Sequence, residues 1–396
     1  MLGILARRLE ELIRTEEPPS VLVSICLAGA ITAGASDVHF EPVEGGIYVR
    51  FRLDGVLHGV AKLPPGLAAP VVARLKVLSG LATYRTDVPQ DGRVHGDGFA
   101  SGADLRLSTY PTVRGEKAVV RIHGADASDP DLAGLGLSRV AREALEAALS
   151  RRDGLIVLTG PAGSGKTTTI YAAIRHMLAR DPVGRQIVTI EDPVERLLPG
   201  ITQTEVQPAL GLTWERCLRS ILRQDPEVVV VGEVRDRETA ALAGQAALSG
   251  HLVLTTLHAG SAAGIFARLV EMGVEPHVVT STVRVALAQR LARRLCRECR
   301  RATAGPDGAP GPWTAPGCPA CWQTGFRGRI PVDEVLTLTR RMREAVLASA
   351  DTTELRERAR EDGFADLSAR GEELVAAGET SPEELARVLG RAGDGF

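Results

Sequence analysis

One segment of the sequence has the residues to bind phosphate groups. Residues 160–167 read GPAGSGKT, directly follow the apolar run 155–159, and fit the P-loop pattern. The glycines let backbone N–H groups turn inward around phosphate oxygens, and a helix expected over residues 168–179 adds the positive end of its dipole. Lys166 would face the β- and γ-phosphates of a nucleotide, and the Thr167 hydroxyl would bind Mg²⁺. The residues expected to bind nucleotide here are Gly160, Pro161, Ala162, Gly163, Ser164, Gly165, Lys166, Thr167 and Thr168.

Two carboxylates follow apolar runs of the kind that form buried strands. The valine run 228–231 leads to Glu233. The apolar run 187–190 leads to Glu191. Parallel sheets bind ligands at the carboxyl ends of their strands, and an acidic side chain there can hold a metal ion or polarise the attacking water in phosphoryl transfer. We expect Glu233 to be the catalytic base; Glu191 is the alternative, and the sequence leaves this choice open.

Two histidines, His251 and His258, flank another apolar run at residues 252–256. An imidazole titrates near neutral pH and can donate a hydrogen bond to a phosphate oxygen. We expect both side chains to bind near the γ-phosphate and to report its state. The other interpretation is that each histidine is a structural residue with partners inside its own domain.

The cysteines supply a separate signal, because two CxxC motifs are separated by eighteen residues. This spacing matches a four-cysteine zinc site. Four thiolates complete a tetrahedron around zinc and leave no open position, so the metal would be structural. Disulfide bonds are the alternative, and a reducing compartment disfavours them. The expected ligands are Cys296, Cys299, Cys318 and Cys321.

The composition limits the classes of protein to which the chain can belong. It has 396 residues, 47 basic against 49 acidic side chains, a formal net charge of -2, and 4% aromatic residues. Such a chain is not typical of a nucleic-acid binder, so we expect no nucleic-acid partner. The uncharged, mainly apolar stretch at residues 20–35 is shorter than the roughly 20 apolar residues that a membrane span needs. With no signal peptide visible, we expect a cytoplasmic protein.

Patterns along the chain predict its organisation. The apolar runs after residue 150 alternate with helical segments, which predicts an α/β fold with a parallel sheet and helices on both faces. Earlier runs that alternate as strands do lie at residues 46–53, 56–61, 103–109 and 116–122. The expected parts are an N-terminal helix (1–18), an N-terminal α/β domain (19–126), a linker (127–131), a P-loop ATPase domain (132–285), a four-cysteine zinc subdomain (286–332) and a helical C-terminal region (333–396).

Several segments, in their order along the chain, resemble motifs of the secretion ATPase superfamily. The combination is most similar to the type II secretion and type IV pilus assembly ATPases, the secretion system protein E family. The matching segments are residues 36–42, 89–93 and 105–109 (N-terminal domain), 160–169 (Walker A), 191–195 (Asp box), 223–236 (Walker B), 250–258 (His box), and 289–291 with the paired cysteines that follow (metal domain).

The resemblance implies a PAS-like N-terminal domain followed by a RecA-like ATPase domain. It implies that the chain binds ATP, Mg²⁺ and Zn²⁺ and hydrolyses ATP as a homo-hexamer. The ring would turn or push an inner-membrane platform protein, in peripheral association with the inner membrane, and so power assembly of a secretion pseudopilus or a type IV pilus. Arg93 and Arg106 precede the linker, so they would reach the nucleotide across a domain or subunit interface; surface ion pairing is the alternative.

Two other functions are compatible with these motifs. A nucleic-acid-translocating, conjugation-type P-loop ATPase, or the ATPase of a DNA-uptake pilus, would share the P-loop, and DNA-stimulated hydrolysis would favour it. A zinc scaffold that binds nucleotide without hydrolysing it would share both motifs. The presence of Lys166, Glu191 and Glu233 favours hydrolysis over such a scaffold.

Overall fold

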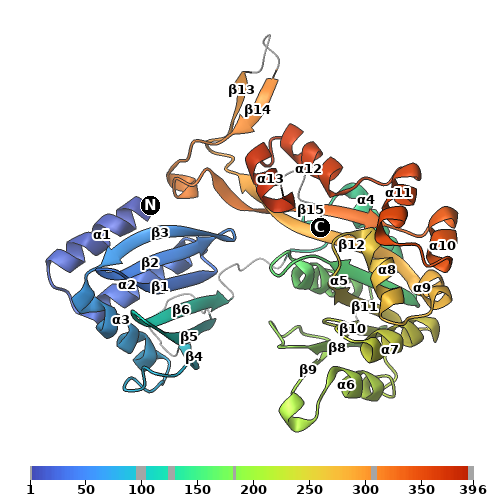
Figure 1. The fold of residues 1–396 in the computed structure, drawn as a ribbon, viewed down its shortest axis with the longest axis horizontal. Helices are drawn as coiled ribbons and strands as arrows, with labels where there is room; N and C mark the ends of the chain where they lie inside the picture. Colours follow the sequence, from blue (N-terminus) through green and yellow to red (C-terminus); the bar gives the residue numbers. More distant parts are fainter. Residues whose placement is uncertain (1, 95–103, 124–129, 182–183, 305–309, 391–396) are drawn as a thin grey trace. The chain divides into compact units, whose positions relative to one another are not determined.

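The chain folds into two units, each assembled from segments that are not contiguous in sequence. A computed structural model describes residues 2–94, 104–123, 130–181, 184–304 and 310–390. The first unit comprises Met1–Asp129, Arg293–Ala302 and Thr314–Gly328, and the second comprises Pro130–Ala292, Thr303–Trp313 and Arg329–Phe396. Figure 1 labels the elements of both. Residues 127–129 of the expected linker lie outside the described residues.

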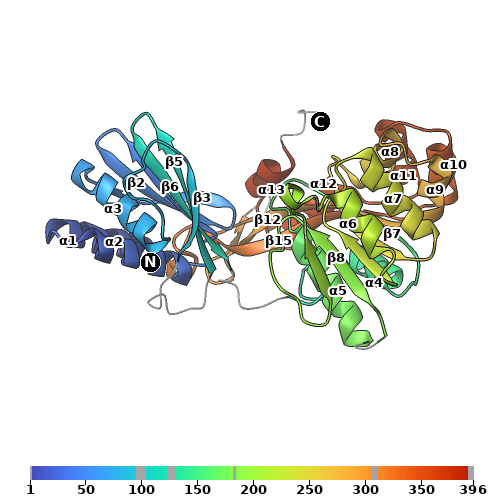
Figure 2. The ribbon, with the colours of Figure 1, turned by 90° about the horizontal axis from the view of Figure 1, so that it is seen from below.

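A six-stranded antiparallel sheet, with the strand order β3-β2-β1-β6-β5-β4, forms the basis of the first unit. The helices α1, α2 and α3 pack on one face of this sheet (Figure 2). The helices are α1 Leu2–Arg14, α2 Pro19–Thr32 and α3 Pro65–Leu78. The strands are β1 Asp37–Val43, β2 Gly46–Leu53, β3 Val56–Leu63, β4 Gln90–Val94, β5 Asp104–Thr112 and β6 Gly115–His123. Four of them, β2, β3, β5 and β6, confirm the strands expected from alternation.

The alternation in β2 shows which face of that sheet the helices cover. Ile47, Val49 and Phe51 are fully buried, whereas Tyr48 and Arg50 between them are only partly buried. Successive residues of a strand point to opposite faces, so the apolar face packs against the helices and the polar face is left uncovered by them.

The uncharged stretch at residues 20–35 forms most of α2, which is a core helix. Its residues Leu22, Cys26 and Leu27 are fully buried in the core of the first unit. Within the described ranges, no helix combines the length and the apolar character that crossing a membrane requires.

The second unit contains a seven-stranded sheet with the order β15-β12-β7-β11-β10-β8-β9. The six strands from β12 to β9 are parallel, so the expected parallel sheet is confirmed. The runs expected as strands are β7, β8, β10 and β11. The strand bounds are β7 Gly154–Thr159, β8 Ile187–Glu191, β9 Thr202–Glu205, β10 Val228–Val231, β11 Leu252–Leu257, β12 Val283–Leu295 and β15 Phe326–Leu336.

Helices cover both faces of the seven-stranded sheet (Figure 1). In β7, Leu155 and Val157 join the core formed with α6 to α11, whereas Ile156 and Leu158 join the core formed with α4 and α5. Burial on both faces explains why these strands read as nearly continuous apolar runs. The helix bounds are α4 Arg139–Leu149, α5 Lys166–Arg180, α6 Trp214–Ile221, α7 Arg237–Leu248, α8 Ala262–Glu271, α9 Pro276–Thr282, α10 Arg340–Leu347 and α11 Thr352–Glu361.

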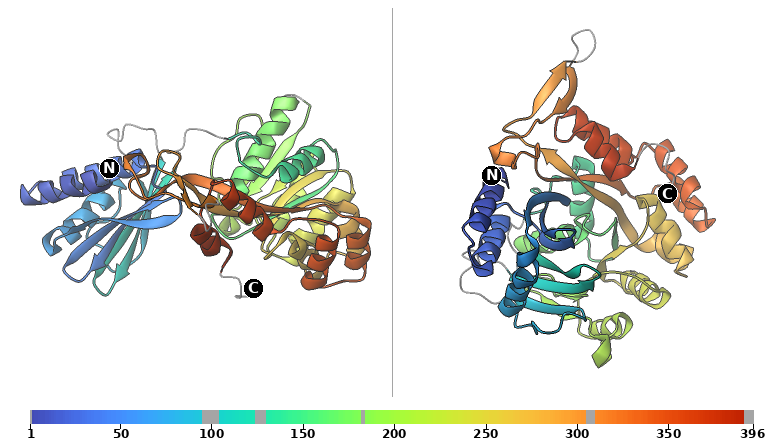
Figure 3. Two further views of the ribbon diagram at one scale, coloured as in Figure 1. Left: turned by 90° about the horizontal axis from the view of Figure 1, so that it is seen from above. Right: turned by 60° about the vertical axis from the view of Figure 1, so that its left-hand side comes forward.

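The strand β12 extends the sheet further along the chain than the expected domain boundary at 285/286. Ala286 pairs with Val157 of β7 inside this strand, which ends directly before Cys296. The helices α12 (Leu367–Ala376) and α13 (Pro382–Leu389) pack on β12 and β15 (Figure 3). Between these strands, β13 (Arg301–Ala304) and β14 (Pro310–Thr314) form a two-stranded sheet. Residues 305–309 of the Pro/Gly-rich stretch lie outside the described residues.

Candidate active site and metal centre

The P-loop connects the end of β7 to the start of α5. Gly165, directly before α5, has a φ of 90°, in the left-handed region that favours glycine. A Cβ atom at Gly160 would lie 2.3 Å from the backbone oxygen of Gln289. The turn at one position and the close approach at the other therefore both require glycine. Thr168 lies on the exposed side of the first turn of α5.

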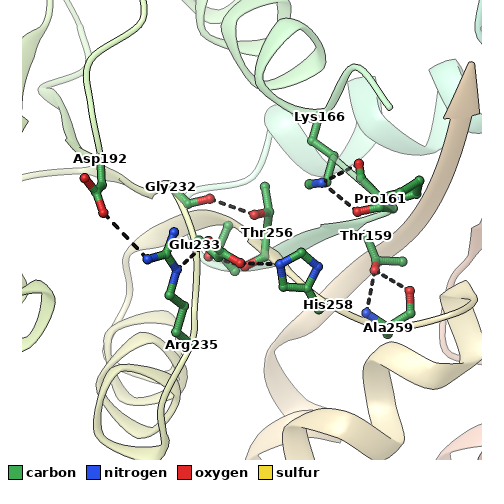
Figure 4. A network of polar contacts seen from close by, with 12 residues as sticks. Thr159, Pro161, Lys166, Asp192, Gly232, Glu233, Arg235, Thr256, His258 and Ala259 are labelled. Atoms are coloured by element: carbon green, nitrogen blue, oxygen red, sulfur yellow. Dashed lines mark hydrogen bonds and ion pairs between the residues drawn. The ribbon is translucent and has the colours of Figure 1, made fainter. Parts of the chain in front are cut away.

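Lys166 lies at the mouth of this loop. Its Nζ donates hydrogen bonds to the backbone oxygens of Gly160 (2.6 Å) and Pro161 (3.1 Å). Figure 4 shows Lys166 beside Pro161. Burial lowers the pKa of Lys166, the carboxylate of Glu233 opposes this shift, and the charge of Arg290 adds to it. An ammonium group donates to carbonyl oxygens and more strongly to anionic phosphate oxygens, so Lys166 can exchange the loop carbonyls for a phosphate.

A pocket of about 360 Å³ opens beside the P-loop. Its position is at the carboxyl ends of the parallel strands, where sheets of this type bind ligands. It offers a cation for phosphate, hydroxyl and carboxylate oxygens of the kind that Mg²⁺ prefers, and carboxylates that could act as a base. The polar residues on its walls that the sequence analysis predicted are Lys166, Thr167, Glu191, Glu233 and His258.

Glu233 sits between two basic side chains in this pocket. Its Oε1 lies 2.6 Å from Nε2 of His258, and its Oε2 accepts a hydrogen bond of 2.6 Å from Nε of Arg235 (Figure 4). Arg235 also lies 3.6 Å from the carboxylate of Asp192. The side chains of Arg235 and His258 are 55% and 71% exposed. Glu233 therefore faces the pocket, and its partners have room to move away from it.

Glu191 is held in a different way, because it is buried and fully hydrogen-bonded. Its Oε1 accepts hydrogen bonds from the Thr189 hydroxyl (2.5 Å) and from Nε2 of Gln203 (2.9 Å), and its Oε2 accepts one from the Tyr171 hydroxyl. Burial, together with the hydrogen bond to Glu191, raises the pKa of Tyr171, so this phenol keeps the proton that it donates. Both oxygens of Glu191 are thus occupied by neutral donors.

The strand β11 separates the two histidines. His258 follows its carboxyl end and lines the pocket. His251 precedes its amino end, where Nδ1 lies 3.0 Å from the backbone oxygen of Ala246. A strand rises about 3.3 Å per residue, so the two histidines lie roughly 20 Å apart at opposite edges of the sheet. The structure brings only His258 to the P-loop, and we leave His251 out of the site because its partners are local structural ones.

Hydrogen bonds between strand ends fix the backbone around the pocket. The Thr159 hydroxyl donates to the backbone oxygen of Ala259 and accepts from its N–H, both at 2.8 Å. The Thr256 hydroxyl donates to the backbone oxygen of Gly232 at 2.7 Å. Figure 4 shows both connections. They join the ends of β7, β11 and β10, so the segments that carry Lys166, Glu233 and His258 are held together at the backbone.

Arg93 and Arg106 lie in the first unit, directly opposite each other on β4 and β5. Their Nε atoms lie 2.8 Å and 3.6 Å from the carboxylate of Asp104. Both arginine side chains are exposed, so these ion pairs stabilise little and are easily exchanged for another anion. Their expected contact with a nucleotide remains a prediction.

The four cysteines expected to bind zinc form one cluster. All their Sγ atoms lie within 4.8 Å of one another. The distances are 3.8 Å for Cys296–Cys318, 3.9 Å for Cys299–Cys321 and 3.7 Å for Cys318–Cys321. A tetrahedron with Zn–S bonds of about 2.3 Å has sulfur atoms about 3.8 Å apart, so the cluster fits zinc. All four cysteines are free thiols, which excludes the disulfide alternative in this structure.

Three polar residues around the carboxylates had no predicted role. Arg235 lies two residues after Glu233, in the segment that follows β10, so its position was a usable signal. Tyr171 lies four residues after Thr167 on α5, a spacing that places both on one helix face. Gln203 lies in β9, for which the sequence carried no strand signal.

The fold and the pocket define a P-loop NTPase of the RecA-like type. A parallel sheet, a glycine loop between a strand and a helix, and carboxylates at neighbouring strand ends are the features of that class. Sequence comparison narrows the assignment. The model of the family described as "Type II/IV secretion system protein" matches residues 14–387, and the chain belongs to this family.

Individual relatives and solved structures agree with this assignment. The chain is 40% identical to the type II secretion system protein HxcR of Pseudomonas aeruginosa, over 96% of this chain and 79% of that protein. It is 39% identical to the type IV pilus assembly ATPase PilB of Thermus thermophilus, over 91% of this chain and 42% of that protein. Its fold is similar to that of the Legionella pneumophila ATPase DotB, with a TM-score of 0.68 at 19% identity over 93% and 95% of the two chains. The pilus retraction motor PilT with bound ADP gives a TM-score of 0.60 at 24% identity over 91% and 95%. The chain is therefore a secretion- or pilus-system ATPase.

Proposed function

We propose that the chain is the ATP-hydrolysing motor of a type II secretion or type IV pilus system. It works as a homo-hexamer on the cytoplasmic side of the inner membrane, where it associates peripherally and turns or pushes a platform protein that assembles pilin-like subunits. Family membership supports this proposal, as do relatives named for type II secretion and for type IV pilus assembly. The observation that carries it is a pocket in which the P-loop lysine lies with the carboxylates at the strand ends.

In the proposed site, the P-loop holds the phosphates of ATP. Its backbone N–H groups and the start of α5 supply fixed positive dipoles. Lys166 exchanges the backbone oxygens of Gly160 and Pro161 for oxygens of the β- and γ-phosphates. The hydroxyl of Thr167, which lines the pocket, would hold Mg²⁺. When bound, this ion neutralises negative charge on the phosphates.

We assign proton acceptance to Glu233. Water attacks the γ-phosphorus in line, a bond forms between the water oxygen and phosphorus, and the bond to the ADP oxygen breaks. Glu233 takes a proton from the water as this happens. Its contacts with His258 and Arg235, both 2.6 Å long, orient the carboxylate towards the pocket and can be released because both partners are exposed.

We assign Glu191 a positioning role, because its two oxygens already accept three hydrogen bonds. One of the donors, Gln203, also donates to the backbone oxygen of Arg196 (3.0 Å) and accepts from the N–H of Leu198 (2.6 Å). Glu191 thus anchors the connection between β8 and β9, which forms one wall of the pocket. A group committed to these contacts would have to break them before it could accept a proton from water.

The remaining parts of the proposal concern the metal and the first unit. The cysteine cluster binds one Zn²⁺ as a structural metal and takes no part in hydrolysis. We keep the division of the chain expected from its sequence, with one change: residues 286–292 and 329–332 belong to the ATPase domain because they extend its sheet. Arg93 and Arg106 supply positive charge to the nucleotide across a domain or subunit interface.

The test is ATP hydrolysis by the full chain and its Lys166→Ala variant. The substitution removes the cation that faces the β- and γ-phosphates, so hydrolysis and most nucleotide affinity should be lost. Lys62→Ala is the matched control, because it removes an exposed lysine from β3. In the source organism, Lys166→Ala should also stop secretion or surface piliation. Hydrolysis at the wild-type rate by Lys166→Ala would refute the assignment of the site.

A further inference from the structure

The P-loop is supported by Gln289, a residue of β12 that lies far from the loop in sequence. Gln289 is only 3% exposed. Its Nε2 donates a hydrogen bond of 2.8 Å to the backbone oxygen of Ser164 in the loop, and its Oε1 accepts one of 2.9 Å from the hydroxyl of Thr169 in α5. Both ends of one buried amide are therefore used, one by the loop and one by the helix that follows it.

The loop also lies against Gln289 without intervening atoms. A Cβ atom at Gly165 would come within 2.7 Å of the Gln289 Nε2 atom, and one at Gly160 within 2.3 Å of its backbone oxygen. The preceding residue, Ala288, pairs with Thr159 at the end of β7. Gln289 thus connects the sheet with the phosphate-binding backbone. The loop can pack against Gln289 because Gly160 and Gly165 have no side chains.

The strand holds Gln289 itself in place. Arg290, the next residue, donates from Nη1 to the backbone oxygen of Gln289 and from Nη2 to that of Gly260, both at 3.1 Å. Gly260 lies two residues after His258. The middle of β12 therefore connects the P-loop with the segment after β11.

We propose that Gln289 is a positioning residue for nucleotide binding: it holds the P-loop backbone in the shape that receives phosphate without touching the nucleotide. A P-loop binds through N–H groups whose directions must be fixed beforehand, and a loop that has to be ordered on binding loses affinity. Among side chains of this length, only glutamine offers both the donor that Ser164 uses and the acceptor that Thr169 uses. The inference rests on the proposed function of the P-loop as the ATP site.

The experiment measures binding of MANT-ADP with Mg²⁺, and kcat and KM for ATP, in full-length variants. Gln289→Met keeps the length of the side chain but removes both hydrogen bonds, and Gln289→Glu keeps the acceptor for Thr169 but removes the donor to Ser164. We expect both to raise the Kd for MANT-ADP and the KM for ATP about tenfold, with a much smaller change in kcat. Thr255→Val is the matched control, because it removes a buried hydrogen bond of the same sheet, to Val231, that does not reach the P-loop.

A second measurement links the effect to the observed contact. Thr169→Val removes the donor to Gln289 Oε1 with little change in volume. Its effect on the Kd should overlap with that of Gln289→Met, so that the double variant binds more tightly than the two separate losses predict. Amide exchange in residues 160–169 should become faster in Gln289→Met and remain unchanged in Thr255→Val.

The outcomes separate this inference from the proposal on which it rests. If Lys166→Ala loses MANT-ADP affinity while folded Gln289→Met and Gln289→Glu bind as wild type does, Gln289 has no positioning role. If the affinity losses match that of Thr255→Val, the role is merely structural. If Lys166→Ala itself binds normally, the proposed ATP site is wrong instead. Should neither Gln289 variant fold, Thr169→Val decides alone: an unchanged Kd and unchanged exchange in residues 160–169 would overturn the inference.

Discussion

Changing Glu233 and Glu191 to glutamine, one at a time, would separate the chemical role from the structural one. Glutamine keeps the size of glutamate but cannot accept a proton from water. Among the described contacts, Glu233 pairs only with His258 and Arg235, which are exposed, whereas Glu191 is 6% exposed and accepts three hydrogen bonds. We therefore expect the first substitution to act on the rate of hydrolysis and the second on stability.

The expected effect of Glu233→Gln is on kcat. Removing a general base typically costs a factor of 10²–10⁴, which corresponds to about 3–5 kcal/mol in the barrier. Nucleotide affinity should stay the same or rise, because a carboxylate that would repel the γ-phosphate is gone while Lys166 is intact. The stability of the fold should change little, since the partners of Glu233 are exposed and water can replace it.

The expected effect of Glu191→Gln follows from its contacts. An amide has one acceptor oxygen, and its NH₂ group would face either the Tyr171 hydroxyl or the donors from Thr189 and Gln203. Leaving buried donors without an acceptor costs about 1–3 kcal/mol. At about 2–4 °C per kcal/mol for a domain of this size, the Tm should fall by roughly 2–12 °C. The kcat of the folded protein should fall far less than in Glu233→Gln.

The assay is single-turnover hydrolysis of ATP labelled in its γ-phosphate, with thermal unfolding of each variant measured alongside. Glu271→Gln is the control for loss of a carboxylate, because Glu271 is exposed and pairs only with Arg268 among the described contacts. Normal hydrolysis by Glu233→Gln, combined with a large loss of kcat in a Glu191→Gln variant that keeps the wild-type Tm, would show that the two roles must be exchanged.

Three further predictions concern the metal, the subunit interface and pH. Gently purified protein should contain about one zinc per chain, and Cys296→Ser should lose the metal and speed amide exchange around the cluster; metal-free wild type would contradict the site. Rings mixed from Arg106→Ala and Lys166→Ala subunits should regain part of the activity that each variant lacks. Wild-type rings that contain some Lys166→Ala subunits are the control. If those rings stay active while the mixed mutant rings do not recover, Arg106 does not act in trans. Burial raises the pKa of Glu334, so its contribution to stability is full below its ordinary pKa of about 4.3 and falls as the pH rises towards the raised value. Glu334→Gln should flatten this fall in urea unfolding across that range, and an unchanged slope would refute it.

Much of the second unit could be predicted because its strands are buried on both faces. The runs that became β7, β8, β10 and β11 are largely apolar, with threonine as their polar residue, and glycine or an acidic residue follows the first three. β12 was not predicted, because it is not apolar on both sides. Its sequence VRVALAQRLARRL carries arginines on a partly exposed side and few β-branched residues, so local pattern does not distinguish it from a helix. Its place beside β7 is a tertiary effect.

In the site as well, residue types and spacing predicted which side chains matter, whereas their roles depend on the three-dimensional arrangement. Motif spacing identified both carboxylates and favoured Glu233 as the base, but it could not decide between them, because the choice depends on which carboxylate oxygens already accept hydrogen bonds. It also treated His251 and His258 alike, since both adjoin β11. The direction of β11 in the sheet shows that His258 lies at the same edge as the P-loop. His251 lies at the opposite edge, where it contacts the end of α7.

Residues outside the P-loop motif, far away in sequence, form hydrogen bonds beside the loop, so the motif alone does not include every residue that shapes the site. Thr159 and Ala259 are 100 residues apart in sequence, and Thr169 and Gln289 are 120 apart, yet each pair shares a hydrogen bond beside the phosphate-binding loop. In a parallel sheet, neighbouring strand ends come from distant segments, so the residues that shape a loop after one strand belong to the next strand in space rather than in sequence. Nucleotide affinity in this chain should therefore respond to substitutions in the middle of β12 as well as in the P-loop, although no phosphate-binding pattern extends that far.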